Sequence, residues 1–458
     1  MFSKVKQFFK NIFVNRVFYE GARKTQNRDF YEANAPFENT ASTDRNIIRA
    51  RARWLHENNG IIAGIDNSIV NNVVGNGLKL QVKTGDKNLN ARIENLWDTW
   101  CEKDNCDITK RFHFGDMQRL ILAQRMTDGE ILIIKKHNKN LKNPFSLQLI
   151  ESDRVTSPMQ SISLDDVTVD GLEIDRNGAV IKYYIHQPPS DYIDIKAEDA
   201  ILYFKVENRA SQYRGISEYK QAIIDLRNLA GYQSSLIKNA RVRANIGYIV
   251  ETDSIASKIG NLTAEGNDPI EEINGVIVEY LNPGEKIKTL DPAIVGLDYK
   301  QFVTIAIRTI AVARQISYEL AFRDYSEINF SSARASIIQD HKRFSNEQFH
   351  LVTYVLKPVY WDWLESNVYA GNIKGLTASK FNKYRDDFKP LWIPPKREWV
   401  DPLKDIKAIE MELDLGLTTL KKVAGSRGDD IEDLIKQRAE EIEMLKKAGI
   451  ITDDLEVK

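Results

Sequence analysis

The stretch YRGISEYKQAIIDLRNLAGYQSSLIKNARVRANIG, residues 213–247, decides the fold of this chain. Apolar or small side chains recur within it every three or four residues, and polar side chains occupy the other face. That periodicity predicts an amphipathic helix over residues 216–243. At the rise of an α-helix such a segment is a rod of roughly 40 Å. The patterns on either side of this rod differ from it and from each other.

A second long helical pattern follows the rod after a short insertion. Residues 244–297 contain two strand-like runs, GYIVET and GVIVEYL, around a polar segment with glycine. Residues 298–322 then carry apolar side chains on more than one face of a helix. Such a helix needs neighbours on several sides, which either the core of a large monomer or the flanking subunits of a ring would supply.

The part that precedes the rod changes from helical to strand periodicity. Residues 24–44 are polar and are expected to be extended. The expected helices span 44–58, with Asp44 as N-cap, 61–73, 89–101 and 112–127. The expected strands are 130–136, 145–150, 172–175, 179–186 and 200–206, with a hairpin at Asn177-Gly178. This half is therefore predicted to be an α+β domain with mainly antiparallel strands.

The C-terminal part is mostly helical in its pattern. Residues 331–369 predict a very long helix, capped by Ser331 or Ser332 and kinked at Pro358. Residues 380–400 are rich in Trp, Pro and Tyr and predict irregular structure or short strands. Three charged helices are expected in residues 401–458.

Composition restricts the classes of protein to which the chain can belong. Its 458 residues include 64 Lys and Arg against 65 Asp and Glu, which argues against holding nucleic acid by a strong positive field. A conduit for nucleic acid remains compatible, because a wall that gripped phosphates would stall its cargo. Two cysteines exclude a disulfide scaffold and indicate a reducing compartment.

Membrane segments are not expected. No run approaches 18 apolar residues, so no stable membrane insertion is predicted. The basic, aromatic N-terminal stretch lacks the apolar region and cleavage site of a signal peptide. Contact of this stretch with a membrane surface is conceivable, but an arm that docks on a partner subunit or stays mobile is favoured.

Patterns typical of catalytic sites are absent or incomplete. The chain has no G-x-x-x-x-G-K-[ST] loop, so ATP hydrolysis at a P-loop is not expected. Cys101, Cys106 and His113 have unusual spacing and no evident fourth ligand, so structural cysteines are favoured over a metal site. The paired acids at 165–166 and 386–387 fit a solvated surface better than a two-metal nuclease. We therefore predict no enzyme activity and no cofactor.

Basic residues gather around one polar, aromatic loop between two long helical patterns. The loop runs from Ser317 to Ser331, and its neighbouring cations are Arg308, Arg314, Arg323, Arg334, Lys342 and Arg343. Such spacing is also normal for solvated helix faces, so on its own it is a weak indication of contact with nucleic acid.

Five segments, taken in order, resemble the lambda-type family of phage portal proteins. They are NNGIIAGIDNSIVNNVVGNGLKLQ (58–81), LWDTWCEKDNCDITKRFHFGDMQRLILAQRMTDGEILI (96–133), the stretch at 213–247, ISYELAFRDYSEINFSSARAS (316–336) and WVDPLKDIKA (399–408). The fourth is the most specific. The sequence departs from the family at Glu327-Ile328, where small residues are usual, and at Phe330, where Tyr is usual.

The resemblance implies a portal-type fold: an α+β wing, two long stem helices around a small α/β clip, a tunnel loop and a helical crown. The implied regions are an N-terminal arm at 1–43, the wing at 44–215, stem helices at 216–243 and 298–322, the clip at 244–297, the tunnel loop at 316–331, a long helix with the return to the wing at 332–400, and the crown at 401–458.

The resemblance also implies a function. Portal subunits form a ring, usually of twelve, at the capsid vertex, through which a terminase packages DNA that later leaves by the same channel. The implied partners are other copies of the chain, the terminase large subunit, the major capsid protein, a head–tail adaptor and double-stranded DNA held without sequence specificity. The implied location is the virion, and the host cytoplasm during assembly. A head–tail adaptor or minor capsid protein is the alternative, and a DNA-processing nuclease is less favoured.

Candidate residues follow from this plan. Arg323, Asp324 and Tyr325 would line the narrowest passage, where Arg323 would attract phosphates transiently and Asp324 would prevent their capture. Further channel candidates are Asn329 and Arg334 near the loop and Arg227, Lys238, Arg308 and Arg314 on the stem. The candidate contacts of the clip with a terminase or adaptor are Glu271, Glu272, Glu279 and Asn282.

Overall fold

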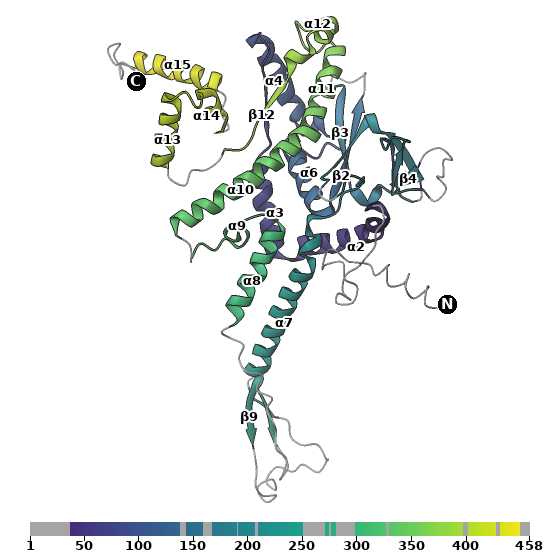
Figure 1. Ribbon diagram of the computed structural model, residues 1–458, viewed down its shortest axis with the longest axis vertical. Coiled ribbons are helices and arrows are strands. Elements are labelled where there is room, and N and C mark those ends of the chain that lie inside the picture. The colour runs from purple at the N-terminus through teal and green to yellow at the C-terminus, as the bar shows by residue number, and fades with distance from the viewer. Residues whose placement is uncertain are drawn as a thin grey trace, which may run out of the picture.

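The computed structural model shows a mixed fold of helices and strands. It describes residues 37–137, 143–158, 167–189, 191–206, 209–250, 271–273, 276–280, 298–326, 329–396, 402–426 and 431–448. A broad body carries a pair of long helices, and this pair extends toward a small three-stranded sheet (Figure 1). The N-terminal arm expected at 1–43 lies outside the described residues up to position 36.

Helices form the first layer of the body. Their bounds are α2 Phe37–Asn58, α3 Gly60–Val73, α4 Lys87–Cys101, α5 Lys103–Cys106 and α6 Phe114–Asp128. The expected cap at Asp44 is wrong, because α2 already begins at Phe37. The cap of α3 is Asn59, whose side chain accepts hydrogen bonds from the backbone of Ile61 and Ile62. Helix α3 ends at a glycine turn, in which Gly75 has a φ of 57°.

Two antiparallel sheets pack beside these helices. One has the order β3-β2-β8 and the other β4-β5-β6-β7. The strands are β2 Glu130–His137, β3 Phe145–Ile150, β4 Val167–Val169, β5 Leu172–Ile174, β6 Val180–Gln187, β7 Asp191–Lys196 and β8 Ala200–Phe204, with single 3-10 turns η2 Ser152–Arg154 and η3 Ala197–Asp199. The expected antiparallel strands and the hairpin are confirmed, and Gly178 takes a φ of 86° in that hairpin. Strands β4 and β7 were not expected.

An aromatic core joins the N-terminal half to the C-terminal half. The ring centroid of Trp97 on α4 lies 4.7 Å from that of Trp100 and 4.9 Å from that of Trp363 on α11 (Lys357–Tyr369). All three side chains are buried. Strand β1 (Lys79–Val82) also pairs antiparallel with β12 (Pro390–Ile393), so the segment after α11 returns to the first helices.

The expected second long helix over 298–322 is wrong beyond position 313. The first long helix is confirmed as η4 Glu218–Gln221 followed by α7 Ile223–Asn245. The second is α8 Asp298–Ala313, and a separate short helix, α9 Tyr318–Phe322, follows it. The break occurs because Gln315 adopts a φ of 53° and the amide of Ile316 donates to the carbonyl of Ala311, which is how many helices end.

The long C-terminal helix is also divided. It consists of α10 Phe330–Leu351, a π-helical segment η6 Val352–Leu356 and α11. Its cap is Asn329, whose side chain accepts from the amide of Ser332 at 2.8 Å, so the expected caps Ser331 and Ser332 are wrong. Pro358 lies just after the π-helical segment. A proline that cannot fit the regular α-helical hydrogen-bond pattern explains why the helix widens there.

The remaining elements agree with the sequence pattern. Residues 380–400 hold only short structure, as expected, between α12 Ala378–Lys383, the 3-10 turn η7 Arg385–Phe388 and β12. The three expected C-terminal helices are α13 Pro402–Asp414, α14 Leu420–Ser426 and α15 Ile431–Lys447. In the insertion, β9 Ile246–Val250 and β11 Val276–Tyr280 are the two expected strands, and β10 Glu271–Ile273 completes their sheet. The rest of residues 251–297 lies outside the described part.

Two glycines let the chain cross itself where the helix pair leaves the body. A Cβ atom on Gly215 would lie 2.1 Å from the carbonyl oxygen of Gly129, and one on Gly129 would lie 2.4 Å from the carbonyl carbon of Ile216. Gly129 also has a φ of 96°, at the end of α6. This close approach sets the path from strand β8 into η4 and α7.

We predict that Gly215→Ala lowers the free energy of unfolding by about 1–3 kcal/mol, because backbone must move to admit the methyl group. Denaturant unfolding followed by circular dichroism measures this. The matched control is Gly231→Ala on α7, where a Cβ would meet nothing within 4 Å. It should be neutral or stabilise the helix by about 0.5–1 kcal/mol. If Gly215→Ala is as stable as the wild type, the close backbone approach of Gly215 to Gly129 is contradicted.

Candidate channel site and its charged base

One largely buried carboxylate lies at the base of the helix pair and binds three arginines. Glu218, in η4, accepts from Arg125 through Oε1, and from Arg314 at 2.7 Å and Arg343 at 2.8 Å through Oε2. Arg125 belongs to α6 and Arg343 to α10, while Arg314 directly follows α8. Four elements distant in sequence therefore meet at a single side chain.

Two further carboxylates complete this charged hub. Glu347 on α10 accepts from Arg125 at 2.5 Å and from Lys205 at 2.8 Å. Asp66 on α3 accepts from Arg314 at 2.8 Å and from the hydroxyl of Tyr219. We call the set of Asp66, Arg125, Lys205, Glu218, Arg314, Arg343 and Glu347 the charge hub. Five of them are buried, the side chain of Glu218 is 9% exposed, and Lys205 is half-buried.

The cations of the hub keep its acids ionised. Burial raises the pKa of Glu218, but Arg125, Arg314 and Arg343 outweigh it and hold that pKa well below the ordinary value. The pKa of Glu347 is also lowered, chiefly by Arg125 against its burial. A hydrogen bond to Asp66 raises the pKa of His56, whose Nδ1 lies 2.8 Å from the carboxylate. The carboxylate of Asp66 thus favours the protonated form of His56, which borders the hub.

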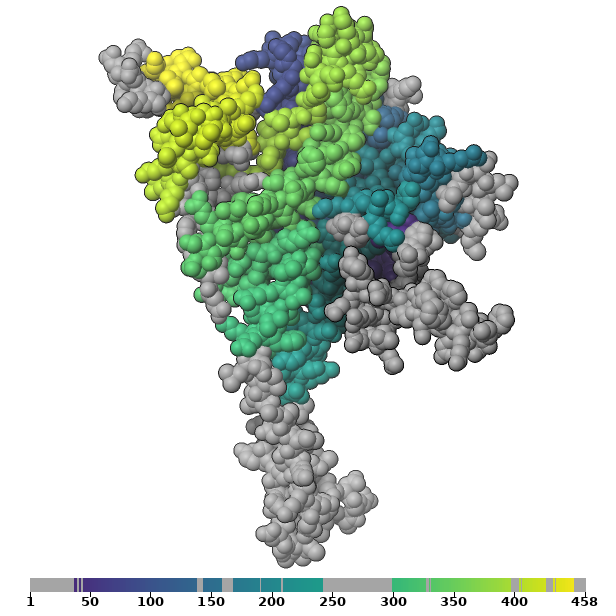
Figure 2. Space-filling model, in the orientation of Figure 1, coloured from purple at the N-terminus to yellow at the C-terminus, as the bar shows by residue number. Residues whose placement is uncertain are grey.

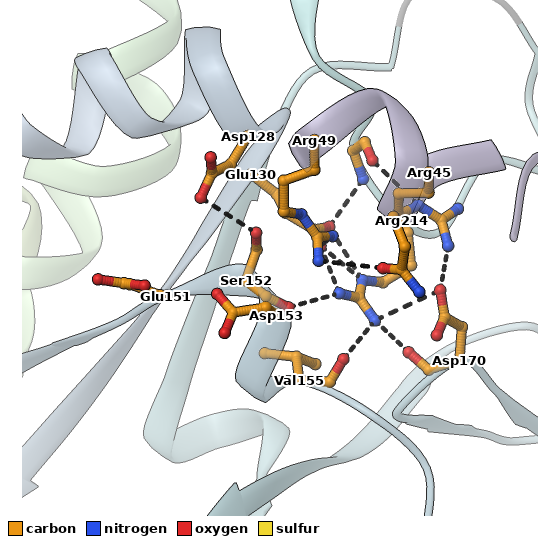
Figure 3. Close-up of polar contacts among 12 residues, drawn as sticks. Arg45, Arg49, Asp128, Glu130, Glu151, Ser152, Asp153, Val155, Asp170 and Arg214 are labelled. Atoms are coloured by element: carbon orange, nitrogen blue, oxygen red, sulfur yellow. Dashed lines mark hydrogen bonds and ion pairs between the residues drawn. The ribbon is translucent and has the colours of Figure 1, made fainter. Parts of the chain in front are cut away.

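A second buried cluster fixes the residues just before the hub (Figure 3). Nε of Arg214 donates to both carboxylate oxygens of Glu130, at 2.8 and 2.9 Å. The same guanidinium donates to the backbone carbonyls of Ser152 and Val155. The amide of Gly215 donates to Glu130 at 2.8 Å. The segment entering the first long helix is therefore tied to strand β2 and to the loop after β3.

The loop candidates lie between α9 and α10. Arg323 is exposed, adopts a φ of 56° and donates to the hydroxyl of Ser68 on α3 at 3.3 Å. Asp324 accepts from the amide and hydroxyl of Ser326, and these hydrogen bonds lower its pKa. Tyr325 is exposed, and Asn329 is exposed as the cap of α10. Arg323, Asp324 and Tyr325 thus lie together on one short, accessible segment.

The remaining candidates divide into three groups. Arg227, Lys238 and Arg308 are exposed on α7 and α8, and Arg308 also lies over the ring of Tyr318, 5.3 Å from its centroid. Arg334, on the first turns of α10, is half-buried. Glu271, Glu272 and Glu279 lie on strands β10 and β11, but their side chains and Asn282 are outside the described set.

The expectation for Arg314 is wrong. Its side chain has no exposed surface and pairs with Glu218 and Asp66, so it cannot contact DNA in a channel. The sequence suggested it because it lies beside other cations at the end of a helix.

The carboxylates of the hub were missed by reasoning from the sequence. Glu218 lies at the start of the expected helix over 216–243, where its side chain had no predicted role. The available signal was Arg125, a charged residue within the apolar run of α6. A cation at a core position predicts a buried acid, although not which acid.

Among the described residues, no group of three His, Cys, Asp or Glu side chains could hold a metal ion. Cys101 and Cys106 are free thiols, and burial raises the pKa of Cys106 to about 12, so it is a poor nucleophile at neutral pH. None of the helices in the described ranges combines the length and apolarity that crossing a bilayer requires.

Comparison with known proteins decides the family. The sequence model of the family described as phage portal protein, lambda family, matches residues 23–348, which is most of the chain. The chain belongs to this family. The probable portal protein of Halomonas phage phiHAP-1 is 25% identical over 429 residues, which cover 89% of this chain and 82% of that protein. Portal protein B of Escherichia phage lambda is 21% identical over 451 residues, with 88% and 84% covered.

Solved structures were compared as well. A chain from the neck of a native GTA particle, computed with C12 symmetry, matches with a TM-score of 0.40 and 10% identity, over 83% of this chain and 97% of that one. Membership of the portal family makes this chain a phage portal subunit. It is a structural protein of a phage and not an enzyme.

We predict that Glu218→Gln lowers the free energy of unfolding by about 3–5 kcal/mol, because it leaves three buried arginines around a neutral group. Denaturant titration of the purified subunit measures the change. The control is Glu198→Gln, which breaks a solvent-exposed ion pair with Lys196. It should change stability by less than about 1 kcal/mol. If the two substitutions lower the free energy of unfolding by similar amounts, the hub does not stabilise the subunit as proposed.

His56 predicts a pH dependence of stability. Its pKa is raised in the folded state, so its stabilising contribution is complete below about pH 6.5 and is lost as pH rises through the folded value. The melting temperature of the wild type should therefore fall between pH 6 and pH 8.5 relative to that of His56→Gln. If the melting temperatures of the two proteins change with pH in the same way, the coupling of His56 to Asp66 is refuted.

Proposed function

We propose that this portal subunit assembles into a closed ring whose lumen conducts double-stranded DNA. In this proposal the body with the two antiparallel sheets is the wing, α7 and α8 are the stem, the β9–β11 sheet belongs to the clip, the segment after α9 is the tunnel loop, and α13–α15 are the crown. Twelve copies is the expected number, as in portal rings generally.

The observation that carries the proposal is an apolar surface on the stem that no part of the described subunit covers. Ile305 and Val312 on α8 are 63% and 75% exposed, and Phe302 on the same helix is also exposed. Ile224 and Ile237 are exposed on α7. Figure 2 shows the green surface of residues from about 300 to 350 uncovered on the face that it presents. Contiguous exposed apolar residues mark protein interfaces, and a ring supplies a neighbour on each flank.

We further propose that the tunnel loop contacts DNA weakly. Arg323 would attract phosphates, while the ionised carboxylate of Asp324 next to it would prevent their retention. Asp324 is held ready for this role by its hydrogen bonds with Ser326. The near equality of cationic and anionic residues in the chain supports a wall that interacts weakly with its cargo.

The partners follow from the same arrangement. The clip would dock the terminase large subunit during packaging and a head–tail adaptor afterwards, with Glu271, Glu272, Glu279 and Asn282 as candidate contacts. The wing would contact the major capsid protein. The ring would form in the host cytoplasm and function at the portal vertex of the virion.

We predict that the purified wild type forms rings with a central hole wide enough for duplex DNA, and that Ile305→Asp prevents their formation. A charge in an apolar subunit contact costs the desolvation of that charge. Negative-stain electron microscopy and native mass spectrometry measure ring formation. Thr99→Asp on α4, away from the helix pair, is the control for a charge added at an exposed helical threonine. Monomers of the wild type at high concentration would refute the proposed ring.

A further inference from the structure

A cavity of about 380 Å³ opens beside the charge hub and is lined by Lys205, Val206, Glu218, Lys220, Gln221, Ala313, Gln315 and Arg343. It lies where η4, the end of β8, the end of α8 and helix α10 meet. Three of its lining residues are cationic and one is a carboxylate. The cavity is therefore an electropositive pocket in a chain whose net charge is only -1.

The hub's carboxylates are already occupied by its cations. Oε1 and Oε2 of Glu218 both accept from arginines, and the two oxygens of Glu347 accept from Arg125 and Lys205. Arg343 is 8% exposed, and its Nε has no acceptor within the described part of the chain. The lining of the cavity holds three cations against one carboxylate that is already bound by arginines, so the cavity favours an anionic group from outside the subunit.

Gln315 is the second unusual feature of this cavity. Its φ of 53° is a left-handed conformation in which helices commonly place glycine. The chain keeps a side chain at this strained position, and that side chain lines the cavity. Strain of this kind is often retained where the side chain has a role in binding.

The surroundings of the cavity resemble a protein interface more than a nucleic-acid groove. Val206, which lines the cavity, is 56% exposed, and Val312 is exposed one turn before Gln315. Exposed apolar side chains next to a charged pocket are typical of the rim and core of a protein contact. A pit of this size admits one carboxylate side chain, whereas the phosphates of duplex DNA follow a long convex surface.

We propose that this pocket binds a carboxylate side chain from a second copy of the chain, the neighbour in the ring. The inference rests on the proposed ring and adds a specific polar contact to it. The incoming carboxylate accepts from Arg343 and Lys205 and from the amide of Gln315. The contact joins the hub of one subunit to its neighbour, so that ring closure and the position of the stem depend on the same charges.

Gln315→Glu tests the pocket, because it places the subunit's own carboxylate among the same donors. We expect the concentration of half-assembly to rise by about tenfold, which corresponds to the loss of one charged contact. The melting temperature of the isolated subunit should not fall. The control is Gln187→Glu, an identical charge change at an exposed position on β6, outside the cavity. Native mass spectrometry over a dilution series gives the assembly midpoints.

A second measurement detects the contact directly. Rings are assembled from equal amounts of ¹⁴N- and ¹⁵N-labelled wild-type subunits and treated with a carbodiimide, which joins a lysine to a carboxylate in contact with it. Mixed-isotope peptides containing Lys205 or Lys220 are expected. The intrachain product of Lys205 with Glu347 is the internal control.

The outcomes separate the two proposals. If Gln315→Glu assembles at the same midpoint concentration as the wild type, and no interchain product forms at Lys205 or Lys220, the pocket does not bind a neighbour's carboxylate. The proposed ring would be unaffected by that result. If Gln315→Glu forms rings normally but binds duplex DNA more weakly than the wild type, the pocket contacts phosphate groups. That result would also overturn the inference. Failure of the wild type to form rings would instead refute the proposed function.

Discussion

The carboxylate of Glu218 is the point at which the body, both long helices and helix α10 depend on one another. Three guanidinium groups surround it, and none of the elements that carry them is adjacent to η4 in sequence. Buried ion pairs seldom add net stability over an apolar core, but removal of one partner is costly. The hub instead fixes the relative positions of the helices, because a carboxylate that must contact three arginines is compatible with few arrangements of the elements that carry them. The direction in which the helix pair leaves the body is set there.

The long helices combine this charged base with an apolar outer surface. Most charges at this base are paired inside the subunit, whereas the apolar side chains of Ile305, Val312 and Ile224 are exposed. A monomer gains nothing from such a surface, and a closed ring buries it on both flanks of each copy. The balanced overall charge fits the same design, since specific pairing inside the subunit leaves a weak net field for passing phosphates.

Periodicity in the sequence predicted the elements that local pattern controls. Five of the seven strands in the two antiparallel sheets, the Asn177-Gly178 hairpin and the three C-terminal helices were correct, because each depends on neighbours in sequence; β4 and β7 were missed. The break after Ala313 was missed since a left-handed Gln315 has no compositional signal, unlike glycine. The pairing of β1 with β12 and the partners of Arg125 were also missed, because contacts across hundreds of residues leave no trace in a single sequence. The family motifs predicted the family, which is confirmed, but they could not distinguish the buried Arg314 from the exposed Arg308.

The loop after α9 is firmly anchored at its root and accessible at its tip. The amide and hydroxyl of Ser317 both donate to Asp340 on α10, at 2.8 and 2.6 Å, and Tyr318 lies under Arg308 of α8. Beyond this root, Arg323 and Tyr325 are exposed. A root held by two helices keeps the backbone in place, so contacts made by the tip can form and break through side-chain motion alone. Such an arrangement suits a surface that touches a moving polymer, because no contact requires the helices that carry the ring to rearrange.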